Sequence, residues 1–98
     1  MAKLTAKETV ELLKEVFKQD FGGKENGRYK ISIERLLHLT GHQVLSLAFI
    51  TELMEEAIDE GIILINTGAS YSVIEMSIVR GYRNVPPSVI SNLLLKNT

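Results

Sequence analysis

Residues 29–78 decide the fold of this chain and read YKISIERLLHLTGHQVLSLAFITELMEEAIDEGIILINTGASYSVIEMSI. Apolar and polar residues alternate from Tyr29 to Ile33, which predicts a short strand. Ser32 is suited to cap a helix over about 33–39, and Thr40-Gly41 supplies turn chemistry directly after it. The stretch therefore opens with a strand, a short helix and a turn.

A longer helix is expected from about Gln43 to Glu60, ending at Gly61. Spacing of about 100° per residue gives its C-terminal half a core face of Ile50, Leu53, Met54, Ala57 and Ile58. Leu47 continues the same direction. The opposite face carries the carboxylates Glu52, Glu55, Glu56, Asp59 and Glu60. In the N-terminal half of the helix, the side that continues this acidic face is apolar instead, with Val44, Leu45, Ala48 and Phe49. The N-terminal half must therefore be covered on both sides.

A β-hairpin is expected after the long helix. Ile62 to Ile65 is β-branched and apolar, and residues 66–70 form a turn in which Gly68 is free to adopt positive φ. The partner strand is expected from Tyr71 to Ile78, with Gly81 breaking it. Pro86-Pro87 then precedes a last helix over about 87–95. Its apolar face consists of Val89, Ile90, Leu93 and Leu94.

A first helix precedes residue 29. Thr5 and Glu8 have the spacing of a capping box, which satisfies otherwise unpaired amides at a helix start. The apolar stripe that follows contains Ala6, Val10, Leu13 and Phe17, widened by Leu12 and Val16. Gly22-Gly23 is expected to end this helix.

The composition is that of one globular domain. The 98 residues, 45% of them hydrophobic, predict a single unit over 1–98 with its core between 5 and 80. There is no cysteine, which excludes disulfides and thiolate chemistry. No apolar run approaches the roughly 18 residues that span a bilayer, and the start MAKLTAKETV lacks a secretory signal. We therefore expect a cytoplasmic protein without a membrane partner.

The succession KISIERLLHLTG, FITELMEEAIDEGIILI and NTGASYSVIEM resembles the winged helix-turn-helix family over about half of the chain. The resemblance implies an α+β fold, with a three-helix core, a small antiparallel β-hairpin wing and an extra C-terminal helix. It also implies binding to duplex DNA, by a regulator of transcription or an accessory factor in DNA processing.

The distribution of charge departs from that family. Its third helix usually enters the major groove, where lysine and arginine neutralise phosphates. Here no lysine or arginine lies between Arg35 and Arg80. DNA contacts are therefore expected mainly from both chain ends and the wing. The candidates are Lys24, Arg28, Lys30, Arg35, Gln43, Ser46, Asn66, Thr67, Ser70, Arg80 and Arg83.

Two other surfaces have alternative interpretations. The apolar patch around Leu45 and Phe49 either packs within the chain or joins the last helix in a homodimer interface. That interface would consist of Leu45, Phe49, Val89, Ile90, Leu93 and Leu94. The acidic row is either a solvated face or a docking site for a basic protein at Glu52, Glu55, Glu56 and Asp59. In the second case the chain is a winged-helix interaction module that does not bind DNA.

Catalysis and metal binding have little support. The chain lacks a P-loop, a GxGxxG or GxSxG motif, and cysteine. His38 and His42 are four residues apart, but Thr40-Gly41 separates them and no third ligand is evident. We expect neither an enzyme nor a cofactor.

Overall fold

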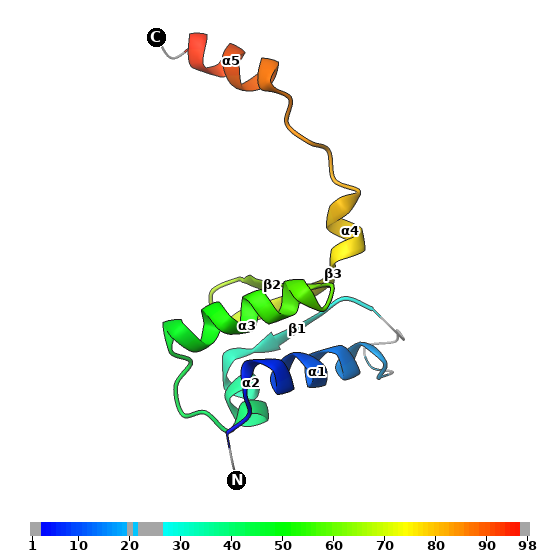
Figure 1. Cartoon of the computed structure of the whole chain (residues 1–98), viewed down its shortest axis with the longest axis vertical. Helices are drawn as coiled ribbons and strands as arrows, with labels where there is room; N and C mark the ends of the chain where they lie inside the picture. Colours follow the sequence, from blue (N-terminus) through cyan, green and yellow to red (C-terminus); the bar gives the residue numbers. More distant parts are fainter. Residues whose placement is uncertain (1–2, 20, 22–26, 97–98) are drawn as a thin grey trace.

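The computed structural model describes residues 3–19, 21 and 27–96. Along the chain the elements are α1 (Ala6–Phe17), β1 (Tyr29–Ser32), α2 (Ile33–Thr40), α3 (Leu47–Asp59), β2 (Ile62–Asn66), β3 (Ser70–Glu75), α4 (Met76–Arg80) and α5 (Pro87–Lys96). Figure 1 shows α1 to β3 in one body, with α4 leading the chain away toward α5. The described part is therefore an α+β fold with five helices and one small sheet.

The three strands form an antiparallel sheet in the order β1-β3-β2. Tyr29 pairs with Val73, and Leu64 pairs with Val73 from the other side. The expected hairpin is confirmed, and Gly68 in its turn has φ 102°. Alternate residues point to opposite faces, so one face is buried and the other carries Lys30 and Ser72.

The buried face of the sheet meets α1 and α3. The fully or almost fully buried apolar residues are Ala6, Val10, Leu13, Phe17, Tyr29, Leu36, Leu53, Ala57, Ile62, Leu64, Tyr71 and Val73. Tyr29 fastens β1 to α1, because its hydroxyl donates to the Leu13 carbonyl at 2.7 Å. The Phe17 ring packs edge-on against the Tyr29 ring at 5.0 Å between centroids. The position of β1, and of the residues beside Tyr29, is thus set by the core.

Two element boundaries differ from the sequence prediction. α1 ends at Phe17, capped by Lys18, whereas the Gly22-Gly23 stop lies outside the described residues. β3 ends at Glu75, and the segment expected to extend it to Ile78 forms the short helix α4 instead. The Met76 amide donates to the Gly61 carbonyl at 2.8 Å, which continues the β2–β3 pairing by one position, and the chain turns into α4 from there.

α3 is also shorter than predicted, and its core face is narrower. Ser46 caps the helix by accepting a hydrogen bond from the Phe49 amide at 3.1 Å, so residues 43–46 precede it. Leu53 is fully buried, but Leu47 is 83% exposed and Ile58 is 54% exposed. Placing Leu47 and Ile58 on the core face was wrong. Both lie about 120–140° around the helix from Leu53, and α1 and the sheet cover only the Leu53 side.

α5 forms where it was expected, but it does not join the core. Every residue from Gly81 to Lys96 is exposed, and Figure 1 shows α5 at the far end of an extended segment. The Cα radius of gyration is 16.9 Å, whereas a compact domain of this length has about 13 Å. We call residues 81–96 the C-terminal arm.

Candidate nucleic-acid interface

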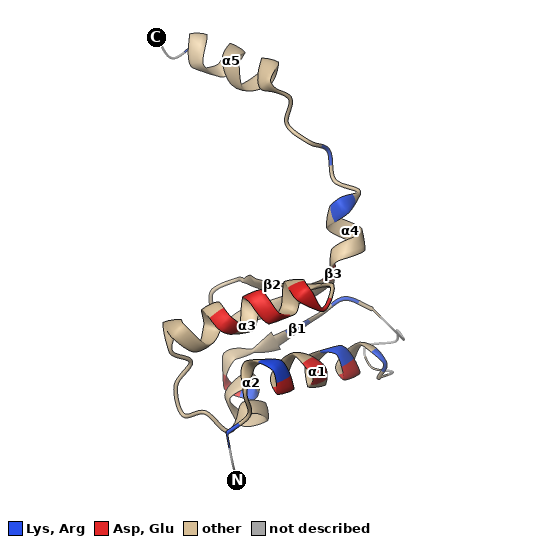
Figure 2. Cartoon of the chain, in the orientation of Figure 1, with Lys and Arg blue, Asp and Glu red and all other residues tan. Residues whose placement is uncertain are grey.

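The sheet brings basic residues from both chain ends to one end of the body. Lys30 pairs with Ser72, and Arg28 precedes β1 at the end where β3 finishes and α4 begins. Arg80 is the last residue of α4. Figure 2 shows the corresponding blue segments at the start of β1 and on α4. We call Arg28, Lys30 and Arg80 the basic rim.

The side chains of the rim are available for a ligand. All three residues are exposed, and none forms an ion pair with another described residue. An unpaired, solvated cation loses little when a phosphate approaches it, whereas a paired one must first give up its partner. The rim can therefore bind anions without disturbing the fold.

Two other basic candidates do not join the rim. Arg35 lies in the first turn of α2, and its amide donates to the Ser32 hydroxyl at 3.2 Å. This places it at the opposite end of β1, near the wing, because the Ile33 amide donates to the Ala69 carbonyl. Arg83 lies in the arm, beyond Gly81. Lys24 lies outside the described residues.

The polar side chains of the turn between β2 and β3 form hydrogen bonds within that turn. The Thr67 hydroxyl donates to the Ser70 carbonyl at 2.9 Å and lies 2.7 Å from the Ser70 hydroxyl. Asn66 Oδ1 accepts a hydrogen bond from the Gly68 amide at 2.8 Å. These interactions shape the hairpin, so any contribution of the three side chains to phosphate binding is secondary to their structural role.

The start of α3 offers little to a base edge. Gln43 is exposed and precedes the helix, while the oxygen of Ser46 serves as the cap. Along the helix itself there is no basic side chain. Glu52, Glu55 and Asp59 are exposed, and Glu56 is half-buried. Such a surface repels a phosphate backbone.

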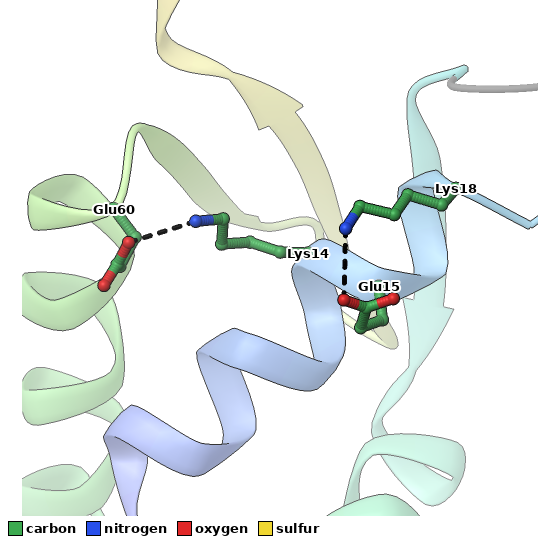
Figure 3. A network of polar contacts seen from close by, with 4 residues as sticks. All are labelled: Lys14, Glu15, Lys18 and Glu60. Atoms are coloured by element: carbon green, nitrogen blue, oxygen red, sulfur yellow. Dashed lines mark hydrogen bonds and ion pairs between the residues drawn. The ribbon is translucent and has the colours of Figure 1, made fainter.

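The lysines nearest the acidic end of α3 are already paired. Lys14 Nζ lies 3.0 Å from Glu60 Oε2, and Lys18 Nζ lies 3.2 Å from Glu15 Oε1 (Figure 3). The first pair joins α1 to the end of α3 across 46 positions, which sequence spacing could not have revealed. These lysines contribute less to an anion site than their number suggests.

The apolar patch at the start of α3 is divided by the structure. Leu45 and Phe49 are half-buried against the core, and Phe49 stacks on the His42 ring at 4.1 Å. This agrees with the intramolecular alternative for these two residues. Val44 remains 72% exposed. The other four interface candidates, Val89, Ile90, Leu93 and Leu94, are all exposed on α5.

The two histidines have different environments. His42 Nε2 lies 2.9 Å from the Leu4 carbonyl oxygen, whereas His38 is exposed. A shallow pocket between them is lined by Glu34, Arg35, Leu37 and Gly41 as well as by both histidines. Among the residues the structure describes, no group of three histidine, aspartate or glutamate side chains could hold a metal ion.

Comparisons with protein-family models, with curated proteins and with solved structures gave no match. Within the described ranges, no helix is long and apolar enough to cross a membrane. The geometry of the rim, the acidic helix and the arm is therefore the basis for assigning a function.

Proposed function

We propose that this chain is a winged-helix DNA-binding protein that contacts duplex DNA through the basic rim. The element order α1-β1-α2-α3-β2-β3, with an antiparallel hairpin after the longest helix, is compatible with that fold. The β2–β3 turn, at the other end of the sheet, makes a second contact with the backbone, and α3 stays out of the major groove. The protein acts in the cytoplasm as a transcription regulator or as an accessory factor in DNA processing.

One observation carries the proposal. Arg28 and Lys30 lie at the end of the sheet from which α4 leaves the body, and Arg80 is the last residue of α4. These cations come from segments about 50 residues apart, between which the chain has no lysine or arginine after Arg35. Binding of this kind is dominated by phosphate contacts, so it is expected to depend strongly on salt and weakly on sequence.

The test is an electrophoretic mobility shift of mixed-sequence duplex DNA at several salt concentrations. The variant Lys30→Ala with Arg80→Ala is expected to bind every duplex more weakly, and the slope of log affinity against log salt should fall by about two. The matched control, Lys3→Ala with Lys7→Ala, removes the same charge near the start of α1. Equal losses of DNA affinity in both variants would show that only net charge matters and would refute binding through the basic rim.

A second function is favoured by a different observation. Glu52, Glu55 and Asp59 form an exposed carboxylate row, and within the described residues none of them forms an ion pair. Such a row suits a basic protein partner. If the wild-type chain fails to shift duplex DNA even at low salt, a winged-helix protein-interaction module is the better description.

A further inference from the structure

The C-terminal arm ends in a helix whose apolar side is uncovered. Val89, Ile90, Leu93 and Leu94 lie along one side of α5 and are between 43% and 62% exposed. Isolated helices shorter than about 12–15 residues are marginal in water, and α5 has only ten. A stable α5 therefore requires a surface that covers this side.

A matching surface runs along α3. Leu47, Thr51, Met54 and Ile58 recur at spacings of four, three and four, which places them in one line on the helix. Leu47 and Ile58 are exposed, and Met54 is half-buried. We call these four residues the α3 stripe. Leu47 and Ile58 leave apolar surface uncovered at both ends of the stripe, a feature that interaction sites share.

The charges beside the two apolar surfaces are complementary. The arm carries Arg83 and Lys96 and no acidic residue. α3 carries four carboxylates and no basic residue, and Glu55 and Asp59 lie next to the stripe. Helices that meet along apolar lines gain specificity from opposite charges at the edges of the contact. The arm and α3 thus fit each other in both hydrophobicity and charge.

The path of the arm favours a second molecule over the same one. Val85 directly precedes Pro86, which itself precedes Pro87, and a residue before proline prefers an extended conformation. α4 and this segment carry α5 away from its own α3, as Figure 1 shows. Between two copies related by a two-fold axis, the same contact forms twice and closes the assembly.

We propose that the chain forms a symmetric dimer by exchanging arms, with α5 of each copy lying on the α3 stripe of the other. The basic residues at the two ends of the arm, Arg83 and Lys96, then lie in the field of the carboxylates of α3 across each contact. The occupant of the α3 stripe is thus a second copy of this chain. This inference does not rest on DNA binding, and mass measurements without DNA decide it.

The first measurement is sedimentation equilibrium of the full chain, whose monomer mass is 10.9 kDa. Wild type is expected at twice that mass. Val89→Ser with Leu93→Ser, and separately Leu47→Ser, should shift it to the monomer, while Leu12→Ser, at an exposed α1 position, should not. A wild-type monomer at high micromolar concentration would overturn the proposal. Circular dichroism verifies that each variant is folded.

The decisive measurement is an exchange of charges between two variants. Variant one carries Arg83→Glu and Lys96→Glu, and variant two carries Glu55→Lys and Asp59→Lys. Each alone should dimerise about tenfold or more weakly, because repulsion replaces attraction at both contacts. Mixing them should restore a heterodimer, in which one contact has both charges reversed and the other has the native charges. The control for variant two is Glu11→Lys with Glu34→Lys, which makes the same change of charge outside α3 and should leave the dimer intact.

Each alternative occupant gives a different result. If α5 folds back on its own α3, wild type is monomeric and mixing restores nothing. If two α5 helices pair with each other, variant two stays dimeric while the serine variant of α5 becomes monomeric. If another protein covers the stripe, the purified chain is monomeric in every form. Any of these outcomes refutes arm exchange, and none of them bears on the rim.

Discussion

Replacing Tyr29 by phenylalanine tests how the body holds β1. The Tyr29 hydroxyl donates to the Leu13 carbonyl at 2.7 Å in a buried environment. Phenylalanine retains the ring contacts with Phe17 and Phe21, at 5.0 and 6.0 Å between centroids. The substitution therefore removes one hydrogen bond and little packing. A buried hydrogen bond of this kind is worth about 1–2 kcal/mol, because the acceptor left behind has no water to replace it.

Urea unfolding at pH 7 measures this loss directly. Tyr29→Phe should lower the free energy of unfolding by about 1–2 kcal/mol and the melting temperature by about 4–8 °C per kcal/mol. Tyr82→Phe is the matched control, since Tyr82 is 61% exposed. Its effect should stay within about 0.5 kcal/mol.

The stability difference between Tyr29→Phe and wild type should also depend on pH in the alkaline range. Burial raises the pKa of Tyr29 well above its ordinary value. Above about pH 10 the unfolded chain releases the phenolic proton while the folded chain retains it, so wild-type stability falls by up to about 1.4 kcal/mol per pH unit. Phenylalanine has no proton to release. The deficit of Tyr29→Phe should therefore shrink between pH 9 and 11.

Two results would refute this reasoning. A deficit below about 0.3 kcal/mol at pH 7 would mean that the hydroxyl is solvated in solution. A deficit that stays constant from pH 9 to 11 would mean that Tyr29 titrates normally and is not buried. Either result would also weaken the case for the basic rim, because Tyr29 fixes the strand that carries Lys30.

Four further substitutions test other parts of the fold, each by urea unfolding at pH 7. Thr5→Ala breaks the capping box, in which the Glu8 amide donates to Thr5 Oγ1 at 3.1 Å, and should cost about 1 kcal/mol. Leu13→Ala, at a fully buried position, should cost about 3 kcal/mol, and Leu12→Ala, at a position 39% exposed, less than half of that. Gly61→Ala should cost about 1–2 kcal/mol, because Gly61 has φ +83° and alanine meets strain there although no atom lies within 4 Å. Equal losses for the two leucines, or none at Gly61, would contradict the packing described.

The features that the sequence predicted correctly rest on local chemistry. The capping box at Thr5, the cap at Ser32 and the turn at Gly41 are all present. So is the hairpin with positive φ at Gly68. In each case the side chain bonds to backbone only two or three positions away, or glycine relieves a local clash. Such interactions do not depend on which other elements pack nearby.

The features that were missed depend on distant contacts. Residues 76–80 are rich in β-branched side chains, and Glu75 makes no side-chain cap hydrogen bond, so nothing local marks α4 as a helix. The hydrogen bond from the Met76 amide to the Gly61 carbonyl, 15 positions away, continues the β2–β3 pairing, and the strand ends at this point. Similarly, Leu47 and Ile58 look like core residues by periodicity, but the placement of α1 leaves them outside.

The candidate site was predictable in part. The absence of basic residues from the long helix was visible in the sequence and is what separates this chain from a conventional reader of DNA. That Arg28 and Lys30 lie at the end of the sheet where β3 leads into α4 required the strand register. Leu47 and Ile58 of the α3 stripe were assigned to the core by their periodicity, because the partner of the helix was unknown.

The two proposals constrain each other through α3. A helix covered by the arm of a second copy cannot also enter a major groove, so arm exchange and conventional docking are mutually exclusive. Contact through the rim is compatible with arm exchange, because Arg28 and Lys30 lie on the sheet and not on α3. The negative charge of α3 then has two effects, since it attracts the basic arm and repels phosphate. Dimerisation also places two rims in one molecule, and two linked sites bind a duplex more tightly than one when the geometry lets both engage.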